Sequence, residues 1–97
     1  MKKKDLSIEE TFALAIQNQQ INDFIVAEKL YNEIIKRDPN YVNAHNNLGI
    51  LLTQNKKYHK AIICFEKVIE INPNNINALN NLGIIFHNLG ENEKAKD

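Results

Sequence analysis

The octapeptide NAHNNLGI at residues 43–50 returns as NALNNLGI at residues 77–84, with a single difference in eight positions. The two copies begin 34 residues apart, and self-similarity at a fixed period of this length is typical of repeat architectures. The same spacing of 34 separates further identical pairs outside the octapeptides, namely Pro39 and Pro73, Ala27 and Ala61, and Ala61 and Ala95. The chain is therefore predicted to be built from repeated structural units.

Each unit is predicted to contain two helices. Ser7 followed three residues later by Glu10 is a capping-box pattern that marks a helix start. Apolar side chains then recur at helical spacing over 8–16 and again over 24–35. The second helix is expected to end at Asp38-Pro39, because proline disfavours helical backbone in the residue before it. This order of helix, break, helix and stop predicts an antiparallel hairpin.

The later units copy this plan. Helices are expected near 41–54 and 58–71, and another from about residue 74 to residue 88, where Leu89-Gly90 offers a glycine stop. Gly49 and Gly83 fall inside these helices, where glycine costs about 1 kcal/mol relative to alanine. We expect close helix contact to offset this cost, with Ala61 packed against Gly49 and Ala95 against Gly83.

Composition excludes several classes of protein. The 97 residues contain 12 basic and 12 acidic side chains, so there is no basic excess of the kind that nucleic-acid binders carry. No stretch approaches the ~20 apolar residues that span a bilayer, and the basic run Lys2-Lys3-Lys4 is followed by acidic residues rather than the apolar segment of a signal peptide. The single cysteine, Cys64, cannot form an internal disulfide. A cytoplasmic protein without membrane or nucleic-acid partners is predicted.

These residues resemble the tetratricopeptide repeat, whose pattern runs roughly W-x2-L-G-x2-Y, then A-x3-F, then P. In the unit over 42–75, the pattern is met by Leu48-Gly49, Ala61, Phe65 and Pro73, while His45 takes the Trp place and Leu52 the Tyr place. The resemblance implies an all-α solenoid of about two and a half hairpins. The expected layout is a mobile N-terminus over 1–6 and a repeat domain over 7–97, divided into about 8–41, 42–75 and an incomplete 76–97.

The resemblance also implies a concave groove, formed by the first helix of each hairpin, that holds a peptide or a partner's helix. Helical-wheel projection places mostly uncharged amide side chains on this face of the second and third units. A carboxamide can pair with both the N–H and the C=O groups of an extended peptide. The predicted peptide-binding residues are Asn43, Asn46, Asn47, Ile50, Gln54, Asn77, Asn80, Asn81, Ile84 and His87. In the first unit, the same face offers Phe12, Ile16, Gln19 and Gln20, among others.

Asn47 and Asn81, one repeat apart, are similar to the asparagine ladder of the repeats in O-linked N-acetylglucosamine transferase. The corresponding residue of the first unit is Ala13, so the ladder has two rungs. The alternative is that these amides only solvate a helix face. A carboxylate clamp, the other known use of this fold, is disfavoured, because its basic places hold Phe12, Asn77 and Asn81.

No residue pattern predicts catalysis or a cofactor. His45 takes a core position and His59 is expected to be exposed, and no histidine lies three or four residues from another histidine or a cysteine, so no metal site is predicted. Cys64 is expected to be a small core residue. We predict that the chain is not an enzyme in itself and that it binds no cofactor.

The third hairpin lacks its return helix within these 97 residues, and this should leave apolar side chains uncovered. Two explanations stay open: a longer protein, or a homodimer through the uncapped third repeat. The functional prediction is a protein-interaction scaffold with an unidentified protein or peptide partner. The alternatives are a substrate-recruiting N-terminal arm of a larger enzyme, such as a protein-modifying transferase, and a self-assembly module.

Overall fold

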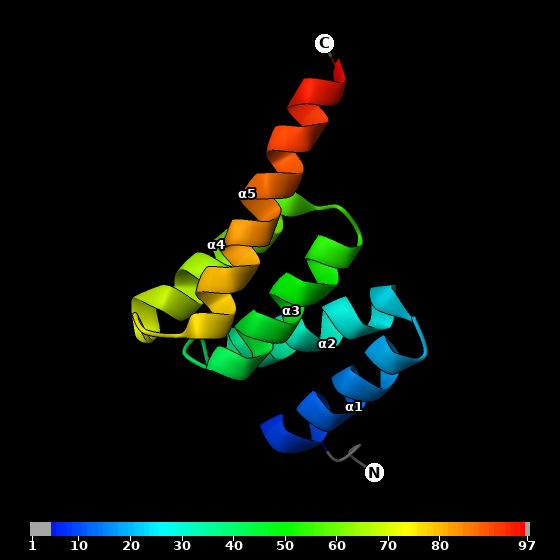
Figure 1. Ribbon diagram of the computed structural model, residues 1–97. Coiled ribbons are helices and arrows are strands. Elements are labelled where there is room, and N and C mark those ends of the chain that lie inside the picture. Colours follow the sequence, from blue (N-terminus) through cyan, green and yellow to red (C-terminus); the bar gives the residue numbers. More distant parts are fainter. Residues whose placement is uncertain (1–4, 97) are drawn as a thin grey trace.

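A computed structural model describes residues 5–96 and the side chains of residues 5–91. Within this part of the chain there are five helices and no strands, which confirms the all-α solenoid (Figure 1). The helices are α1 (Ile8–Gln20), α2 (Phe24–Arg37), α3 (Val42–Gln54), α4 (Tyr58–Ile71) and α5 (Ile76–Lys96). The mobility predicted for residues 1–6 concerns mainly residues 1–4, which lie outside the described part.

Local sequence signals set the helix ends. The Ser7 hydroxyl accepts a hydrogen bond from the Glu10 N–H at 3.0 Å, and the Glu10 carboxylate accepts one from the Ser7 N–H at 2.9 Å. This reciprocal pair is the capping box predicted at the start of α1. The turns that close α1 and α3 each contain a residue with positive φ, Asn22 at 64° and Lys56 at 62°. These two residues lie 34 positions apart, so the turn geometry repeats with the sequence.

The helices form two antiparallel hairpins, α1/α2 and α3/α4, with α2 packed on α3 and α4 packed on α5. Tyr31, Phe65, Leu51 and Ile85 are among the largest side chains that are fully buried between them. The assembly is elongated, with principal extents of 60 × 28 × 18 Å, and the C-terminal part of α5 projects beyond the other helices (Figure 1). Among the described residues, no helix combines the length and apolar character needed to cross a membrane.

Gly49 is required by a close contact with α4. A Cβ atom added to Gly49 would lie 2.6 Å from Cζ of Phe65 and within 2.9 Å of two further atoms of that ring. The nearest neighbour is therefore the phenyl ring, one helical turn beyond Ala61 on α4, and the predicted approach of Ala61 stays a prediction. At Gly83 nothing lies within 4 Å of an added Cβ. The predicted partner of Gly83, Ala95, lies outside the residues whose side chains are described.

The predicted helix stop at Leu89-Gly90 is wrong. The last helix, α5, runs without a break through Gly90 to Lys96, and Gly90 does not adopt a positive φ. A glycine lowers helix stability by about 1 kcal/mol but does not by itself end a helix. The segment that follows it contains Glu91, Glu93, Lys94 and Ala95, all strong helix formers, so the helix continues.

Candidate functional site

A pocket of about 340 Å³ opens where the first hairpin meets α3. The side chains around it come from the last turns of α1, the following turn, the start of α2, and α3. The lining residues are Ile16, Gln19, Gln20, Asn22, Phe24, Asn47 and Gln54. Five of these seven are amides and none is charged. The pocket can therefore offer hydrogen bonds to uncharged polar groups and apolar contact at its edges.

The pocket unites part of the predicted binding face. Asn47 and Gln54 belong to the predicted peptide-binding set, and Ile16, Gln19 and Gln20 were expected on the same face of the first hairpin. Asn22 and Phe24 were missed because wheel projection treats only helix interiors, and both residues border the α1–α2 turn. Asn22 adopts a positive φ, which asparagine tolerates in turns. Its residue type is therefore a sequence signal for the turn that borders the pocket.

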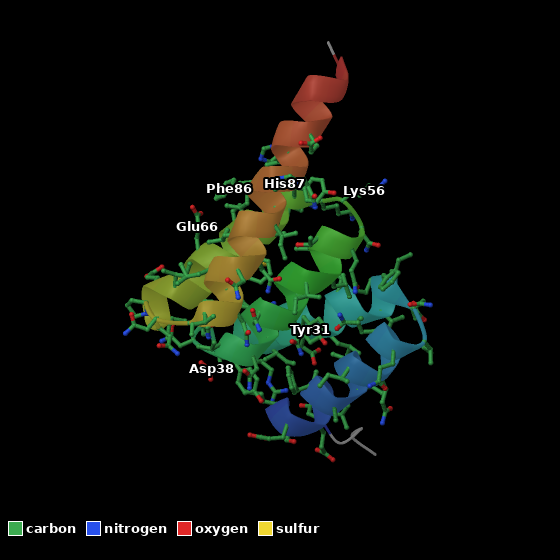
Figure 2. All side chains as sticks on the ribbon, in the orientation of Figure 1. Tyr31, Asp38, Lys56, Glu66, Phe86 and His87 are labelled. Carbon is green, nitrogen blue, oxygen red and sulfur yellow. The ribbon has the colours of Figure 1, made fainter. Side chains whose placement is uncertain are left out.

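The remaining predicted residues do not line this pocket. Asn46, Ile50 and Asn81 are half-buried, whereas five others are exposed: Asn43, Asn77, Asn80, Ile84 and His87. The Asn46 oxygen is buried and has no hydrogen-bond partner among the described residues. Figure 2 shows His87 on α5, away from Tyr31, which lies where α1, α2 and α3 meet. The site described by the pocket thus belongs to the first two repeats.

The buried Tyr31 is hydrogen-bonded to one of the residues that line the pocket. Tyr31 is fully buried, and its hydroxyl donates a 2.6 Å hydrogen bond to the Gln19 side-chain oxygen. Its ring packs edge-on against Phe12 with the centroids 6.1 Å apart. Burial raises the pKa of the Tyr31 hydroxyl, and a hydrogen bond with the Asn47 side chain partly opposes that rise.

This arrangement determines which atoms remain available. The Gln19 side-chain oxygen accepts from the Tyr31 hydroxyl, so the Gln19 amide nitrogen keeps hydrogen-bonding capacity, and the Asn47 carboxamide in the pocket lining carries both donors and an acceptor. A peptide unit presents the complementary groups, an N–H and a C=O.

The residues considered for chemistry are structural. His45 is 8% exposed and its Nε2 lies 2.7 Å from the Pro39 carbonyl oxygen, as a packing histidine would. Cys64 is buried, and burial, with a smaller contribution from the nearby Glu28 charge, raises the pKa of its thiol to about 11. A thiol in that state is not an activated nucleophile. His59 is exposed, as expected. Among the described residues, no three side chains gather to form a metal site.

Comparisons with known structures identify proteins of the same fold. The first TPR of Spaghetti (RPAP3), bound to the HSP90 peptide SRMEEVD, superposes with a TM-score of 0.82 at 26% identity, covering 87% of this chain and 67% of that one. A crystal structure of MamA gives 0.84 at 27% identity, covering 92% and 49%. The TPR2B domain of yeast Sti1 in complex with pHsp70 gives 0.80 at 26% identity, covering 91% and 70%. The chain thus spans about half to two thirds of these structures.

Family models give the assignment. Two tetratricopeptide repeat models match the sequence, one over residues 42–75 and the other over residues 64–97. A search of the curated proteins finds no match. The two repeat matches together cover residues 42–97, which is more than half of the chain, and the helical hairpins of the structure have the fold of the solved neighbours. The chain therefore belongs to the tetratricopeptide repeat family.

Proposed function

We propose that the chain is an interaction scaffold that binds an extended, predominantly uncharged peptide segment across the concave face of α1, α3 and α5. The observation that carries this proposal is the uncharged, amide-lined pocket, in which the Gln19 side chain is held by the buried Tyr31 hydroxyl. Solved neighbours with the same fold are bound to an HSP90 peptide or form a pHsp70 complex.

The ligand is proposed to pair through its backbone. Asn47 lines the pocket, and Asn81, at the equivalent position of α5 and half-buried like Asn47, supplies the second rung of the amide ladder. A neutral hydrogen bond contributes only ~1 kcal/mol net, so two rungs and apolar contact with Ile16 and Ile50 support binding in the micromolar range. Such a scaffold recognises extended conformation more than side-chain identity.

An acidic peptide is a poor candidate. The peptide SRMEEVD in the Spaghetti structure carries two glutamates and an aspartate. None of the seven residues around the pocket described above can neutralise a carboxylate, and the basic places of a carboxylate clamp are occupied by Phe12, Asn77 and Asn81. Desolvating a carboxylate without a cationic partner is unfavourable. We expect SRMEEVD to bind much more weakly than an uncharged segment.

The test uses peptides selected from a random twelve-residue library, titrated by calorimetry. The double variant Asn47→Ala/Asn81→Ala should weaken binding by roughly tenfold or more, since two hydrogen bonds of ~1 kcal/mol are lost. The matched control Gln17→Ala/Asn32→Ala removes two exposed amides that lie outside the pocket and should leave the affinity unchanged. Equal affinities for both double variants, or SRMEEVD binding as tightly as the selected peptides, would contradict the proposal.

A further inference from the structure

One face of α5 is uncovered where the matching face of α3 is covered. Leu79 is 48% exposed and Phe86 is 56% exposed. Their equivalents one repeat earlier, His45 and Leu52, are 8% and 3% exposed. Both α3 residues belong to the helix that packs against α4 in its hairpin. Large apolar side chains exposed together on one helix face normally mark an interface.

The uncovered face has a regular spacing. Ile76, Gly83 and Gly90 lie seven residues apart, and Leu79 and Phe86 fall between them with the same period. Positions three and four residues apart share one side of a helix, so these five residues form a single stripe. Exposure is high at Ile76 as well, at 69%, and an added Cβ at Gly83 or Gly90 would touch nothing within 4 Å. The stripe alternates large side chains with bare backbone.

Charge also favours pairing of this face with itself. Residues 76–90 contain no lysine, arginine, aspartate or glutamate. Two copies of such a segment can therefore approach without like-charge repulsion, which ordinarily prevents self-pairing of surface helices. A partner selected by charge, in contrast, would find nothing on this stripe to recognise. An uncharged apolar surface of the same pattern is the complementary choice.

The protein already contains the contact that this stripe could make. In the second hairpin, the Phe65 ring lies so close to Gly49 that a Cβ atom there would be 2.6 Å from the ring. Gly83 is the repeat equivalent of Gly49, and its surface is bare. Phe86 lies one turn away on the same stripe, and its ring is more than half exposed. A phenyl ring and the glycine site that receives it are thus both present on one helix face.

We propose that two copies of the chain associate through antiparallel packing of their α5 helices, with Phe86 of each copy seated on Gly83 of the other. An antiparallel pair centred between residues 84 and 85 places 83 opposite 86 twice by symmetry, as an isologous interface requires. The same register sets Leu79 opposite Gly90. Leu79 and Phe86 then each meet a glycine. This interface goes beyond the proposed peptide groove and does not depend on it.

The first test is sedimentation equilibrium of the full 97-residue chain and of three variants. The wild type should show concentration-dependent dimerisation. Phe86→Ala and Gly83→Ala should each raise the dimer dissociation constant by at least about tenfold, because symmetry removes or blocks two contacts per dimer. Ile84→Ala is the matched control: Ile84 is 53% exposed on the same helix but faces about a third of a turn away, so its replacement should leave the dimer dissociation constant unchanged.

Gly83→Ala also separates a specific contact from general hydrophobicity. The substitution adds apolar surface and raises helix propensity, so non-specific association would be unchanged or stronger. Only a contact that needs bare backbone at Gly83 is weakened. If the wild-type chain is a monomer at high concentration, the proposal is overturned. A dimer that Gly83→Ala leaves intact overturns it as well.

Orientation is tested with a spin label at Ile76→Cys. The native Cys64 is buried and its thiol is poorly ionised, so labelling at the new site dominates. With a rise of 1.5 Å per residue, an antiparallel pair centred at 84–85 separates the two labels by about 25 Å along the helices. A parallel pair places them side by side, about 10 Å apart. The longer distance supports the proposal and the shorter one contradicts it.

Discussion

Replacing Gly49 by alanine gives the sharpest measure of how tightly the repeat is packed. Gly49 lies in the interior of α3, where alanine is the better helix former by about 1 kcal/mol. Helix propensity alone would therefore make Gly49→Ala stabilising. The contact with Phe65 predicts the opposite result, so the two effects can be compared in one variant.

The structure supplies the magnitude. The new Cβ would lie 2.6, 2.8 and 2.9 Å from three atoms of the Phe65 ring, all below ordinary contact distance. Phe65 has no exposed surface, so its ring cannot move aside into solvent. Overpacking of a buried site costs about 1–3 kcal/mol, and three short contacts place this one toward the upper end. After subtracting about 1 kcal/mol of helix propensity, the net loss of unfolding free energy is about 1–2 kcal/mol.

The assay is thermal unfolding followed by circular dichroism. A loss of about 1–2 kcal/mol lowers the Tm of a domain of this size by roughly 4–16 °C. Gly83→Ala is the matched control, since an added Cβ there meets nothing within 4 Å. It should raise the Tm by several degrees when compared in a Phe86→Ala background, in which the proposed association is removed. The double variant Gly49→Ala/Phe65→Leu should recover part of the loss, because a smaller side chain relieves the contact.

Two results would refute this reasoning. If Gly49→Ala were as stable as the wild type, the ring would have room to shift and the glycine would not be a packing requirement. If Phe65→Leu failed to relieve Gly49→Ala, the destabilisation would come from elsewhere in the hairpin. In either case, the contact between Gly49 and Phe65 would no longer support the proposal that Gly83 receives a phenyl ring.

Two further predictions concern titration. The Ser7 N–H and hydroxyl lower the pKa of Glu10, so the folded chain gains stability from this carboxylate above its unfolded pKa and loses it as pH falls through the folded pKa. Between pH 7 and pH 3, the Tm of the wild type should therefore fall further than that of Glu10→Gln. Equal decreases in Tm would show that the capping box carries no charge-dependent stability. The thiol pKa of about 11 at Cys64 predicts slow alkylation by iodoacetamide at pH 8 in the native chain and rapid alkylation in urea. Fast alkylation of the native chain would show that the α3/α4 hairpin opens readily.

The sequence was most informative where structure depends on neighbours along the chain. The capping box at Ser7 and the boundaries of α3 and α4 follow from local hydrogen bonding and from helical periodicity, both visible in the residue order. The close approach of the Phe65 ring to Gly49 could not be predicted, because it depends on how α3 and α4 cross. Period and spacing place Ala61 and Phe65 on the same helix but do not say which of them reaches the glycine.

The sequence likewise predicted some residues of the site but not the contacts between them. Wheel projection identified Asn47 and Gln54 because inner-face positions recur with the repeat. It could not show that the Gln19 side chain is held by the buried Tyr31 hydroxyl, since that depends on the packing of α1 against α2. Phe65 replaces Tyr31 in the next hairpin, so that hairpin has no such hydroxyl. The two rungs of the proposed ladder are equivalent in sequence but not in chemistry.

The proposed ladder residue of α5, Asn81, and the Gly83 and Phe86 stripe lie on opposite sides of one helix, so the two proposals are compatible. Successive residues are rotated by about 100°, which places Asn81 about half a turn from the middle of the Gly83 and Phe86 stripe. Self-pairing would therefore leave the amide-bearing side of α5 free, and a dimer would present two grooves in a fixed antiparallel relation. Two linked sites raise the apparent affinity for a bivalent partner well above that of either alone. Association through α5 would thereby compensate for a groove whose individual hydrogen bonds support only micromolar binding.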